Sequence, residues 1–417
     1  MKYSRLIIPL LTAAVMALSA CGETDEIEVA RPVSISFSWW GKDVRHGYTL
    51  PAIKDFVLMN PEIEVITEYS EFDPFQRKMD VEFAAHDECD VMQINYDWLF
   101  RYSPDGTGFY DLNELSEYIK LDNFSEDELS YGMINGRLNG ISNALNTETC
   151  YFNADIYASY GLPVPDTWDA LFNAAEFMAA DGVYPIELNR KSSWLCCIAH
   201  EEQQTGVRCF DKDGSLTFTQ ENFEHMLEFY KRMIDHRVTK YVNDIDKQDF
   251  IDGVSAGAVY WISDAGYYCQ PLIDKGMNIV VGEYLRIPNS ELSGWYAKPT
   301  SLYCIRRDTP APEAAAKLVN FLLNSEDMAK YQGTEKGIPL SRSMLEVLEA
   351  DSKLNGVQYT ANQMLLSSPQ VERISPYLEN NTLLTAFDNA VKSVLFDGGD
   401  IAEQAQTVYE TAQALVD

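Results

Sequence analysis

Basic residues and histidines are scarce in this chain. It has 32 lysines and arginines against 64 aspartates and glutamates, a formal net charge of −32, and only five histidines. A field of this sign repels phosphate backbones and anionic lipid headgroups, so nucleic acid is a poor partner. The histidines suggest no catalytic triad, and the net charge says little about the fold.

Motifs for nucleotide and metal chemistry are also missing. The chain contains no P-loop and no G-x-G-x-x-G motif. Cys196-Cys197-x-x-His200 has no second ligand pair at the spacing of a zinc site, and Asp211-x-Asp213-Gly214 lacks the glutamate that completes an EF-hand loop. We therefore expect no metal and no cofactor, and interpret the second motif as a hairpin turn.

One catalytic motif matches in its residues but not in the elements that flank it. Gly253-Val254-Ser255-Ala256-Gly257 matches the G-x-S-x-G nucleophile elbow, which needs a strand before it and a helix after it. Here a polar, helix-like stretch at 246–252 precedes the motif and the strand-like Ala258–Trp261 follows it, so the order is reversed.

A pair of carboxylates such as Glu71 and Asp97 does not indicate a glycosidase either. A plausible catalytic pair can always be chosen from 64 acids.

Only one apolar run approaches the length of a membrane segment. It spans Leu6 to Leu18, which is signal-peptide length, and no later run could cross a membrane. The run closes on Leu18-Ser19-Ala20-Cys21-Gly22, which resembles the lipobox of bacterial lipoproteins, where the cysteine is acylated after cleavage. We expect residues 1–20 to be a signal peptide and 21–31 to be an acidic tether, anchored in the membrane through Cys21. The alternative is an ordinary cleavable signal with a coincidental cysteine.

Acylation of Cys21 would leave seven of the eight cysteines, an odd number that cannot all pair within one chain. Cys196 or Cys197 could pair with Cys209 across a loop. We favour buried free thiols for most of the seven.

A chain of 417 residues exceeds what one hydrophobic core holds, so we expect two lobes. Apolar periodicity is clearest near the N-terminus, where it predicts a strand at 33–37, a helix around 50–57, a strand at 63–69, a helix around 75–83 and a strand at 91–94. This β-α-β-α-β order predicts a parallel sheet with crossover helices. Further along the chain we expect helices at 168–178, 222–234 and 313–323, a strand at 301–305, and mostly helix from 343 onward.

Ligands of such sheets bind beyond the carboxyl ends of the strands. Those three ends are Trp39-Trp40-Gly41, Tyr69-Ser70-Glu71-Phe72 and Asn95-Tyr96-Asp97-Trp98. Each carries an aromatic ring, and the second and third add carboxylates or amides. Indole rings pack on the C–H faces of sugars while planar polar groups bond their hydroxyls, so the combination suits a carbohydrate. We assign Trp168 to the core and leave Trp98 open between core and ligand.

The mature chain resembles, over nearly its whole length, the family 1 extracellular solute-binding proteins, the carbohydrate receptors of bacterial ATP-driven importers. The markers are Trp39-Trp40-Gly41 with Arg45-His46, Phe56 through Asn60-Pro61, Asp90-Val91-Met92-Gln93-Ile94-Asn95, Thr149-Cys150-Tyr151-Phe152-Asn153, Pro165-Asp166-Thr167-Trp168-Asp169, Gly253 to Trp261, and Pro312-Glu313-Ala314-Ala315-Ala316 with Gly337-Ile338-Pro339. Two departures are Cys89, where relatives often carry proline, and Phe72, where many sugar binders place a tryptophan.

The resemblance implies an α/β, periplasmic-binding-protein-like fold of two lobes, each a sheet flanked by helices, with the ligand in the interlobe cleft. The N-terminal lobe would comprise residues 32–143 plus 297–342, and the C-terminal lobe 144–296 plus 343–417. Binding would close the lobes by a hinge motion, and the closed monomer would dock on the transmembrane permease subunits. No chemistry would be done on the ligand.

The resemblance also implies which residues face the ligand. Carried over by position, these are Glu71, Asn95, Tyr96, Asp97, Trp194, Trp261, Trp295 and Tyr296, with Arg45 and Tyr377 as further candidates and Trp39 and Trp40 added from the strand ends.

The expected function is capture of an oligosaccharide at the extracytoplasmic face of the membrane, because the aromatic surplus favours several sugar units over one. Two alternatives stay open. Acidic residues with aromatics also suit a cationic solute such as a polyamine or peptide. The protein could also belong to a different class, the surface glycosidases, which would release product from a glycan substrate.

The lipid anchor can be tested separately from binding. We expect Cys21→Ala to release the protein from the membrane without loss of ligand affinity, because the tether lies outside the predicted lobes. Fractionation of cells followed by calorimetric titration of the released protein would check this. A released protein that no longer binds would contradict the separation of tether and site.

Overall fold

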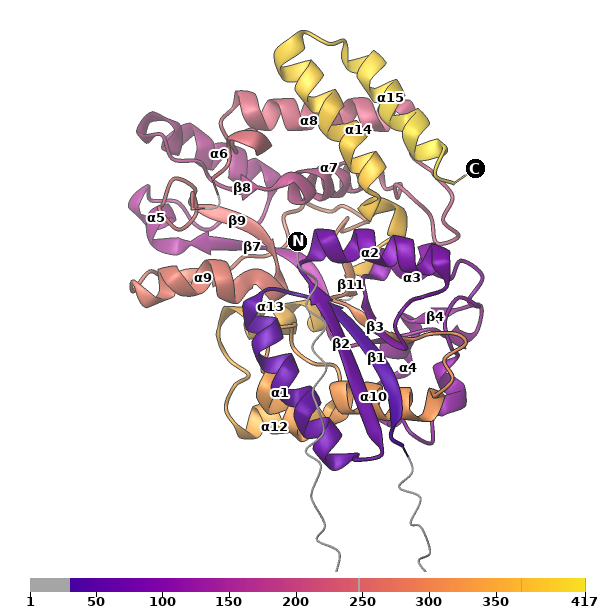
Figure 1. Ribbon diagram of the computed structural model, residues 1–417. Helices are drawn as coiled ribbons and strands as arrows, with labels where there is room; N and C mark the ends of the chain where they lie inside the picture. The colour runs from indigo at the N-terminus through magenta and orange to yellow at the C-terminus, as the bar shows by residue number, and fades with distance from the viewer. Residues whose placement is uncertain (1–30, 247, 369, 417) are drawn as a thin grey trace, which may run out of the picture. The chain divides into compact units, whose positions relative to one another are not determined.

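The computed structural model describes residues 31–246, 248–368 and 370–416 (Figure 1). The predicted signal peptide and Cys21 lie outside these residues. The chain folds into two compact units. Unit 1 comprises the chain up to Asn143, Ser301–Gly333 and Pro339–Leu348, and unit 2 comprises Ala144–Thr300, Thr334–Ile338 and Glu349–Asp417.

Unit 1 is built on a five-stranded sheet with the order β2-β1-β3-β12-β6. Its strands are β1 (Val33–Trp40), β2 (Ile63–Ser70), β3 (Val91–Ile94), β6 (Ile141–Ser142) and β12 (Leu302–Ile305). β1 pairs in parallel with β2 and β3, while β12 runs antiparallel to β3 and β6. The predicted parallel β-α-β-α-β opening is confirmed.

The helices of unit 1 follow from apolar spacing and local capping. They are α1 (Asp43–Met59), α2 (Phe72–Ala85), α3 (Tyr96–Tyr102), α4 (Glu126–Ser130), α10 (Pro312–Asn324), α11 (Glu326–Gln332) and α12 (Arg342–Ala350). α1 ends where predicted, because Asn60 donates its side-chain amide to the Phe56 carbonyl at 2.9 Å and Pro61 follows. A small hairpin of β4 (Met133–Ile134) and β5 (Arg137–Leu138) completes the unit.

Unit 2 is organised around β7 (Leu145–Asn153), all nine residues of which are buried. The sheet order is β13-β11-β7-β9-β8, and β10 also pairs with β7. The other strands are β8 (Glu187–Leu188), β9 (Gly257–Trp261), β10 (Ile279–Val281), β11 (Tyr296–Pro299) and β13 (Glu372–Arg373). β9, β10 and β11 run antiparallel to β7, and β8 is parallel to β9.

The helices of unit 2 cover this sheet. They are α5 (Ala154–Ser159), α6 (Trp168–Met178), α7 (Arg190–Thr205), α8 (Gln220–Asp235), α9 (Ala265–Asp274), α13 (Gly356–Ser367), α14 (Asn381–Lys392) and α15 (Ile401–Gln413). α15, the yellow helix at the end of the chain, packs against α8 and α14 (Figure 1). The predicted helices at 168–178, 222–234 and 313–323 are confirmed, and Trp168 is buried, as expected.

The cysteines and the G-x-S-x-G motif behave as predicted. All seven described cysteines are buried free thiols, so no bridge joins Cys196 or Cys197 to Cys209. A strand, β9, begins at Gly257, the last residue of the motif, and Ser255 is buried. The geometry of a nucleophile elbow is therefore absent at this motif.

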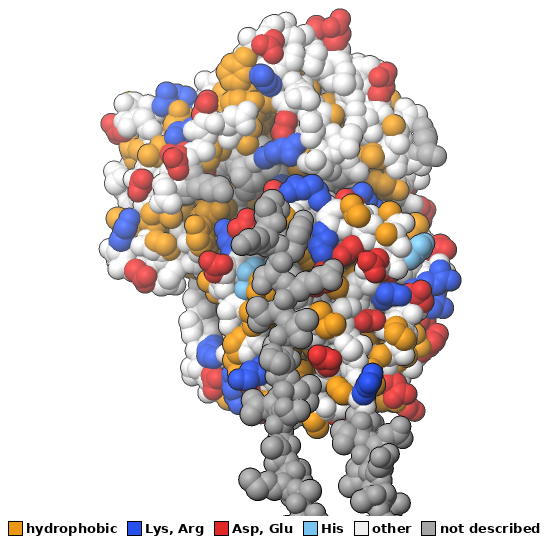
Figure 2. Space-filling model, viewed as in Figure 1, with side chains coloured by type: hydrophobic (Ala, Val, Ile, Leu, Met, Phe, Trp, Pro, Cys, Tyr) orange, Lys and Arg blue, Asp and Glu red, His pale blue; other side chains and the backbone are white. Residues whose placement is uncertain are grey.

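One face of the surface carries charged side chains of both signs (Figure 2). On the face seen in Figure 2, acidic and basic side chains are interspersed and do not form one large patch of either sign. Across the described part of the chain, the structure contains no helix with the length and apolarity that a membrane crossing requires.

One buried side chain, Gln203 on α7, holds several loops of unit 2 in place. Its Oε1 accepts hydrogen bonds from Trp168 Nε1 and from the Ile287 backbone N–H, each at 2.8 Å. Its Nε2 donates to the carbonyls of Leu285 at 3.0 Å and Ser293 at 2.6 Å. All four hydrogen-bonding positions of the amide are used, as burial of a polar group requires.

We expect Gln203→Met to lower the free energy of unfolding by at least about 3 kcal/mol, because the N–H groups of Trp168 and Ile287 and the Ser293 carbonyl lose this partner. The Leu285 carbonyl keeps its bond from Trp295 Nε1. Urea unfolding followed by circular dichroism would measure it. The control is Gln270→Met on α9, where an exposed amide donates to Asp274; it should change stability by less than about 0.5 kcal/mol. Equal effects of the two substitutions would contradict the role of Gln203.

Candidate ligand-binding site

The carboxyl edge of the unit 2 sheet brings together two strand ends. Because β8 is parallel to β9, with Leu188 beside Val259, both strands end at the same edge. Trp261 is the last residue of β9, and α7 begins at Arg190, two residues after the end of β8. This is the edge at which open α/β sheets bind ligands.

Two lysines surround Trp261 at this edge. Lys298 Nζ, from β11, lies 4.5 Å from the centre of the indole ring, and Lys191 Nζ, from the first turn of α7, lies 5.8 Å from it. Both ammonium groups are 2.5 Å from the same oxygen, Oε1 of Glu379. We call Lys191, Trp261, Lys298 and Glu379 the lysine–tryptophan cluster.

The members of the cluster differ in exposure. The side chain of Glu379 is 1% exposed and that of Lys298 8%, whereas Lys191 is 30% exposed and Trp261 is partly exposed. Burial by itself would raise the pKa of Glu379, but attraction to Lys191 and Lys298 outweighs it and holds the pKa at about 2. Glu379 is therefore an anion at all physiological pH values.

A second buried carboxyl, Glu148, lies beside Trp261 in the strand register. Its Oε1 accepts a hydrogen bond from Ser192 Oγ at 2.9 Å. Burial raises the pKa of Glu148 to about 8, against the smaller lowering effects of Ser192, Lys191 and Lys298. At neutral pH this carboxyl is mostly protonated, so it can act as a hydrogen-bond donor.

An aromatic stack continues from β9 into α9. Tyr260 and Tyr268 stack with ring centres 3.9 Å apart, and Tyr267 meets the edge of Tyr268 at 4.9 Å. The hydroxyl of Tyr260 is hydrogen-bonded to buried Glu187. Tyr267 is 64% exposed, so it presents an aromatic side chain to solvent just beyond the strand end.

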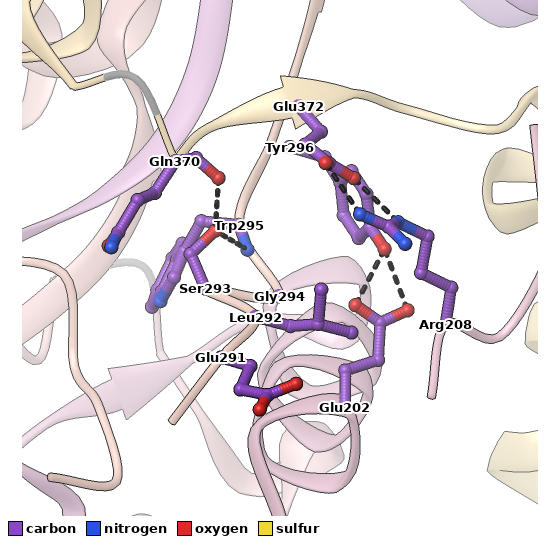
Figure 3. A pocket seen from close by; sticks show the side chains of 10 residues that line it. All are labelled: Glu202, Arg208, Glu291, Leu292, Ser293, Gly294, Trp295, Tyr296, Gln370 and Glu372. Atoms are coloured by element: carbon purple, nitrogen blue, oxygen red, sulfur yellow. Dashed lines mark hydrogen bonds and ion pairs between the residues drawn. The ribbon is translucent and has the colours of Figure 1, made fainter. Parts of the chain in front are cut away.

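A separate pocket of unit 2, shown in Figure 3, has a volume of ≈ 200 Å³. Tyr296 donates its hydroxyl to Glu202 at 2.7 and 2.6 Å, and Arg208 binds Glu372 through two contacts of 2.6 Å (Figure 3). Burial raises the pKa of Glu202 to about 7. Pockets for drug-sized ligands hold roughly 300–1,000 Å³, so this one is too small for an oligosaccharide.

The strand ends of unit 1 form a largely packed aromatic layer. Trp39 is fully buried between Phe37 and Tyr69, with ring centres 4.9 and 4.8 Å away, and its Nε1 donates to His46 Nδ1 at 3.2 Å. Trp40 is 8% exposed. The register pairs Trp40 with Ser70, so the ends of β1 and β2 lie level, as predicted from the sequence.

The polar candidates of unit 1 lie at the same strand ends. Glu71 is exposed at the start of α2. Asn95 donates its side-chain amide to Asp97 at the start of α3, and both are partly exposed. Arg45 Nη1 bonds the Trp40 carbonyl at 3.3 Å.

Three other predicted residues are buried within the two units. Trp194 is fully buried, donates its Nε1 to the Leu378 carbonyl at 2.9 Å and packs on Phe387. Tyr96 is 1% exposed. Trp295 is 4% exposed in the pocket of Figure 3, with its Nε1 bonded to the Leu285 carbonyl at 3.1 Å.

Tyr377 is partly exposed, and its ring is tilted by 37° to that of Phe210, with ring centres 5.2 Å apart. Trp98, left open between core and ligand, is fully buried.

Sequence reasoning missed Lys191, Lys298, Glu379 and Tyr267. The sequence holds one indication for Lys191. α7 begins with Arg190-Lys191 and has no acidic residue in its first turn, although the helix dipole favours acids there and the chain has twice as many acids as bases. Lys298 carries no local signal, because only the pairing of β11 with β7 brings it to Trp261.

Comparisons with known proteins agree with this architecture. Residues 52–357 match the family described as bacterial extracellular solute-binding proteins. A binding protein of Brucella abortus (strain 2308) is 23% identical over 354 residues, which is 83% of this chain and 84% of that protein.

Two solved structures are similar over almost their whole length. The periplasmic oligogalacturonide-binding protein of Yersinia enterocolitica, in complex with saturated digalacturonic acid, superposes with a TM-score of 0.84 at 28% identity, over 92% of this chain and 98% of that one. A periplasmic solute-binding protein of Pectobacterium atrosepticum gives a TM-score of 0.85 at 26% identity, with the same coverage of 92% and 98%. The predicted α/β fold of this family is confirmed.

The raised pKa of Glu148 predicts a pH dependence of stability. Its pKa of about 8 in the folded chain lies above the value of about 4.3 in an unfolded one, so the folded state binds the proton more tightly. Stability that depends on this proton is complete below about pH 4.3 and is lost as the pH rises through 8. We expect Glu148→Gln, which cannot ionise, to flatten the fall of unfolding free energy between pH 5 and 8 by up to about 1.4 kcal/mol per pH unit.

Urea unfolding at four pH values in that range would measure the slope. Glu176→Gln, at an exposed position of α6, is the control and should keep the slope of the parent protein. An unchanged slope in Glu148→Gln would contradict the assignment.

Proposed function

The chain belongs to the bacterial extracellular solute-binding protein family, and we propose that it is the oligosaccharide-binding component of an ATP-driven importer. In this function the protein captures its ligand outside the cytoplasm and delivers it to the membrane permease. The observation that carries the proposal is the partly exposed indole of Trp261 at the carboxyl edge of the unit 2 sheet, with hydrogen-bond donors around it.

The chemistry of this edge suits a sugar. An indole packs on the C–H face of a sugar ring, and ammonium groups donate hydrogen bonds to its oxygens. The similarity to an oligogalacturonide-binding protein at 28% identity supports an oligosaccharide ligand.

A cationic solute is less well supported. Two ammonium groups lie within 6 Å of the Trp261 ring, at 4.5 and 5.8 Å, and would repel a polyamine from that face. A glycosidase is also less well supported, because the family consists of binding proteins.

We propose that units 1 and 2 act as the two lobes of the receptor and close on the ligand by a hinge motion. The exposed strand-end residues of unit 1, Glu71, Asn95 and Asp97, would contribute bonds to sugar hydroxyls. The acylated Cys21 would keep the monomer near its permease and so raise the effective concentration of the receptor.

A thermal-shift screen across oligosaccharides and polyamines tests the function. A ligand at 100 times its dissociation constant stabilises the folded state by roughly 2.7 kcal/mol, so we expect at least one oligosaccharide to raise the melting temperature by several degrees. Release of product from the same oligosaccharides would instead indicate a hydrolase. A shift with polyamines and with no glycan would overturn the proposal.

The position of the ligand is tested by Trp261→Ala. We expect a loss of affinity of at least about tenfold, or 1.4 kcal/mol, measured by isothermal titration calorimetry. Phe177→Ala is the control, because Phe177 is an exposed aromatic residue of the same unit on α6. Equal affinities of the parent protein and Trp261→Ala would remove Trp261 from the site.

A further inference from the structure

Unit 2 has another pocket, beside the C-terminal end of α15. Its volume is ≈ 380 Å³, within the roughly 300–1,000 Å³ of sites for small organic ligands. Three segments line it, namely a hairpin turn at 213–216, Tyr377 from the short helical turn Pro376–Glu379, and the end of the chain from Tyr409 onward. We call it the tyrosine pocket, after Tyr377 and Tyr409. Trp261 is not part of its lining.

The hairpin turn presents polar side chains to this pocket. Asp211 Oδ1 accepts hydrogen bonds from the backbone N–H groups of Asp213 at 3.0 Å and Ser215 at 2.8 Å, which fixes the turn. Gly214 lies between them with a φ of 86°, in the left-handed region that favours glycine. The side chains of Asp213 and Ser215 are exposed and line the pocket.

The two tyrosine rings are held in place by their neighbours. A Cβ on Gly214 would lie 3.3 Å from Cε2 of Tyr377, so the glycine lets this ring approach the turn. The ring of Phe210 lies 5.2 Å from that of Tyr377, between centres. Tyr409 and Gln413 are four residues apart on α15 and so share one face of the helix. Both tyrosines are partly exposed, as a ligand platform requires.

The polar groups of the tyrosine pocket form no hydrogen bond with the described part of the protein. This is true of the side chains of Asp213, Ser215, Tyr377, Tyr409 and Gln413. Elsewhere in unit 2 a partly exposed tyrosine does find a partner, since Tyr160 donates its hydroxyl to Asp181 at 2.9 Å. The donors and acceptors of the tyrosine pocket are therefore available to a ligand.

The charge of the lining favours an uncharged ligand. The residues that line the pocket include one carboxylate, Asp213, and no lysine, arginine or histidine. An anion would meet this carboxylate and the field of a chain with a net charge of −32. A cation would leave the N–H donors of Gln413 without an acceptor. Sugar hydroxyls both donate and accept hydrogen bonds, so they match a lining that offers both.

We propose that the tyrosine pocket is a second saccharide site of unit 2 and that it binds a neutral sugar on the rings of Tyr377 and Tyr409. The rings offer apolar faces to the C–H groups of the sugar, while Asp213 and Gln413 supply planar polar groups for its hydroxyls. The inference goes beyond the proposed function, because this site does not include Trp261. Its sugar comes either from the far end of the captured oligosaccharide or from a separate glycan.

The test titrates neutral trisaccharides and hexasaccharides of the maltose, cellulose, mannan and xylan series into the full chain by isothermal titration calorimetry. At least one should bind about fivefold or more weakly to Tyr377→Ala and to Tyr409→Ala than to the parent protein. A loss confined to hexasaccharides assigns the pocket to the far end of the captured ligand. Loss of a second binding event that persists in Trp261→Ala assigns it to a separate glycan.

Two further variants separate binding from folding, and the melting temperature is recorded for each. Gln413→Ala, at an exposed position, should keep the melting temperature of the parent protein and lower the same affinity at least about twofold. Tyr160→Ala is the matched control, because Tyr160 is a partly exposed tyrosine of unit 2 outside the pocket. It should leave every glycan affinity unchanged.

The failures of the two proposals are distinguishable. Glycan affinities that stay at the parent values in Tyr377→Ala, Tyr409→Ala and Gln413→Ala would overturn the second site and leave the proposed function standing. Binding of spermidine that is lost in Tyr409→Ala, with no glycan bound there, would overturn the neutral ligand. Absence of binding by every glycan would overturn the proposed function and the inference with it.

Discussion

The ionised carboxylate of Glu379 is the constraint on which the architecture of unit 2 depends. It lies at the end of a short helical turn, Pro376–Glu379, and contacts Lys191 at the start of α7 and Lys298 on β11. These three segments are far apart in the sequence. A buried anion without its cations costs roughly 3–5 kcal/mol, so all three must reach their places together. The same lysines border Trp261, at 4.5 and 5.8 Å from the centre of its ring.

Two buried glutamates near Trp261 take opposite protonation states for physical reasons. Glu379 meets two cations at 2.5 Å and stays ionised, whereas Glu148 accepts a hydrogen bond from Ser192 and burial raises its pKa to about 8. The site thus combines positive charge with a neutral donor in a chain of net charge −32.

Much of the fold could be predicted from the sequence because its signals are local. Alternating apolar residues in β1, the Asn60-Pro61 stop after α1 and the spacing of Phe75 and Met79 each act within a few residues. The β-α-β-α-β order then requires a parallel sheet with its carboxyl ends at one edge. The strand-end tryptophans were harder to interpret, because a tryptophan at a strand end suits either a ligand or the core. Trp39 and Trp194 are fully buried, whereas Trp261 is partly exposed.

The sequence by itself determined the family, the order of the strands and helices in the first unit, and the absence of a nucleophile elbow, since all of these depend on short-range patterns and their order. Only the tertiary structure decided which tryptophan is exposed and which side chains surround it. Lys298 reaches Trp261 across β7, and Glu379 comes from a segment more than 100 residues away in the chain. Contacts of this kind are set by strand pairing and by the packing of distant segments, and no local periodicity records them.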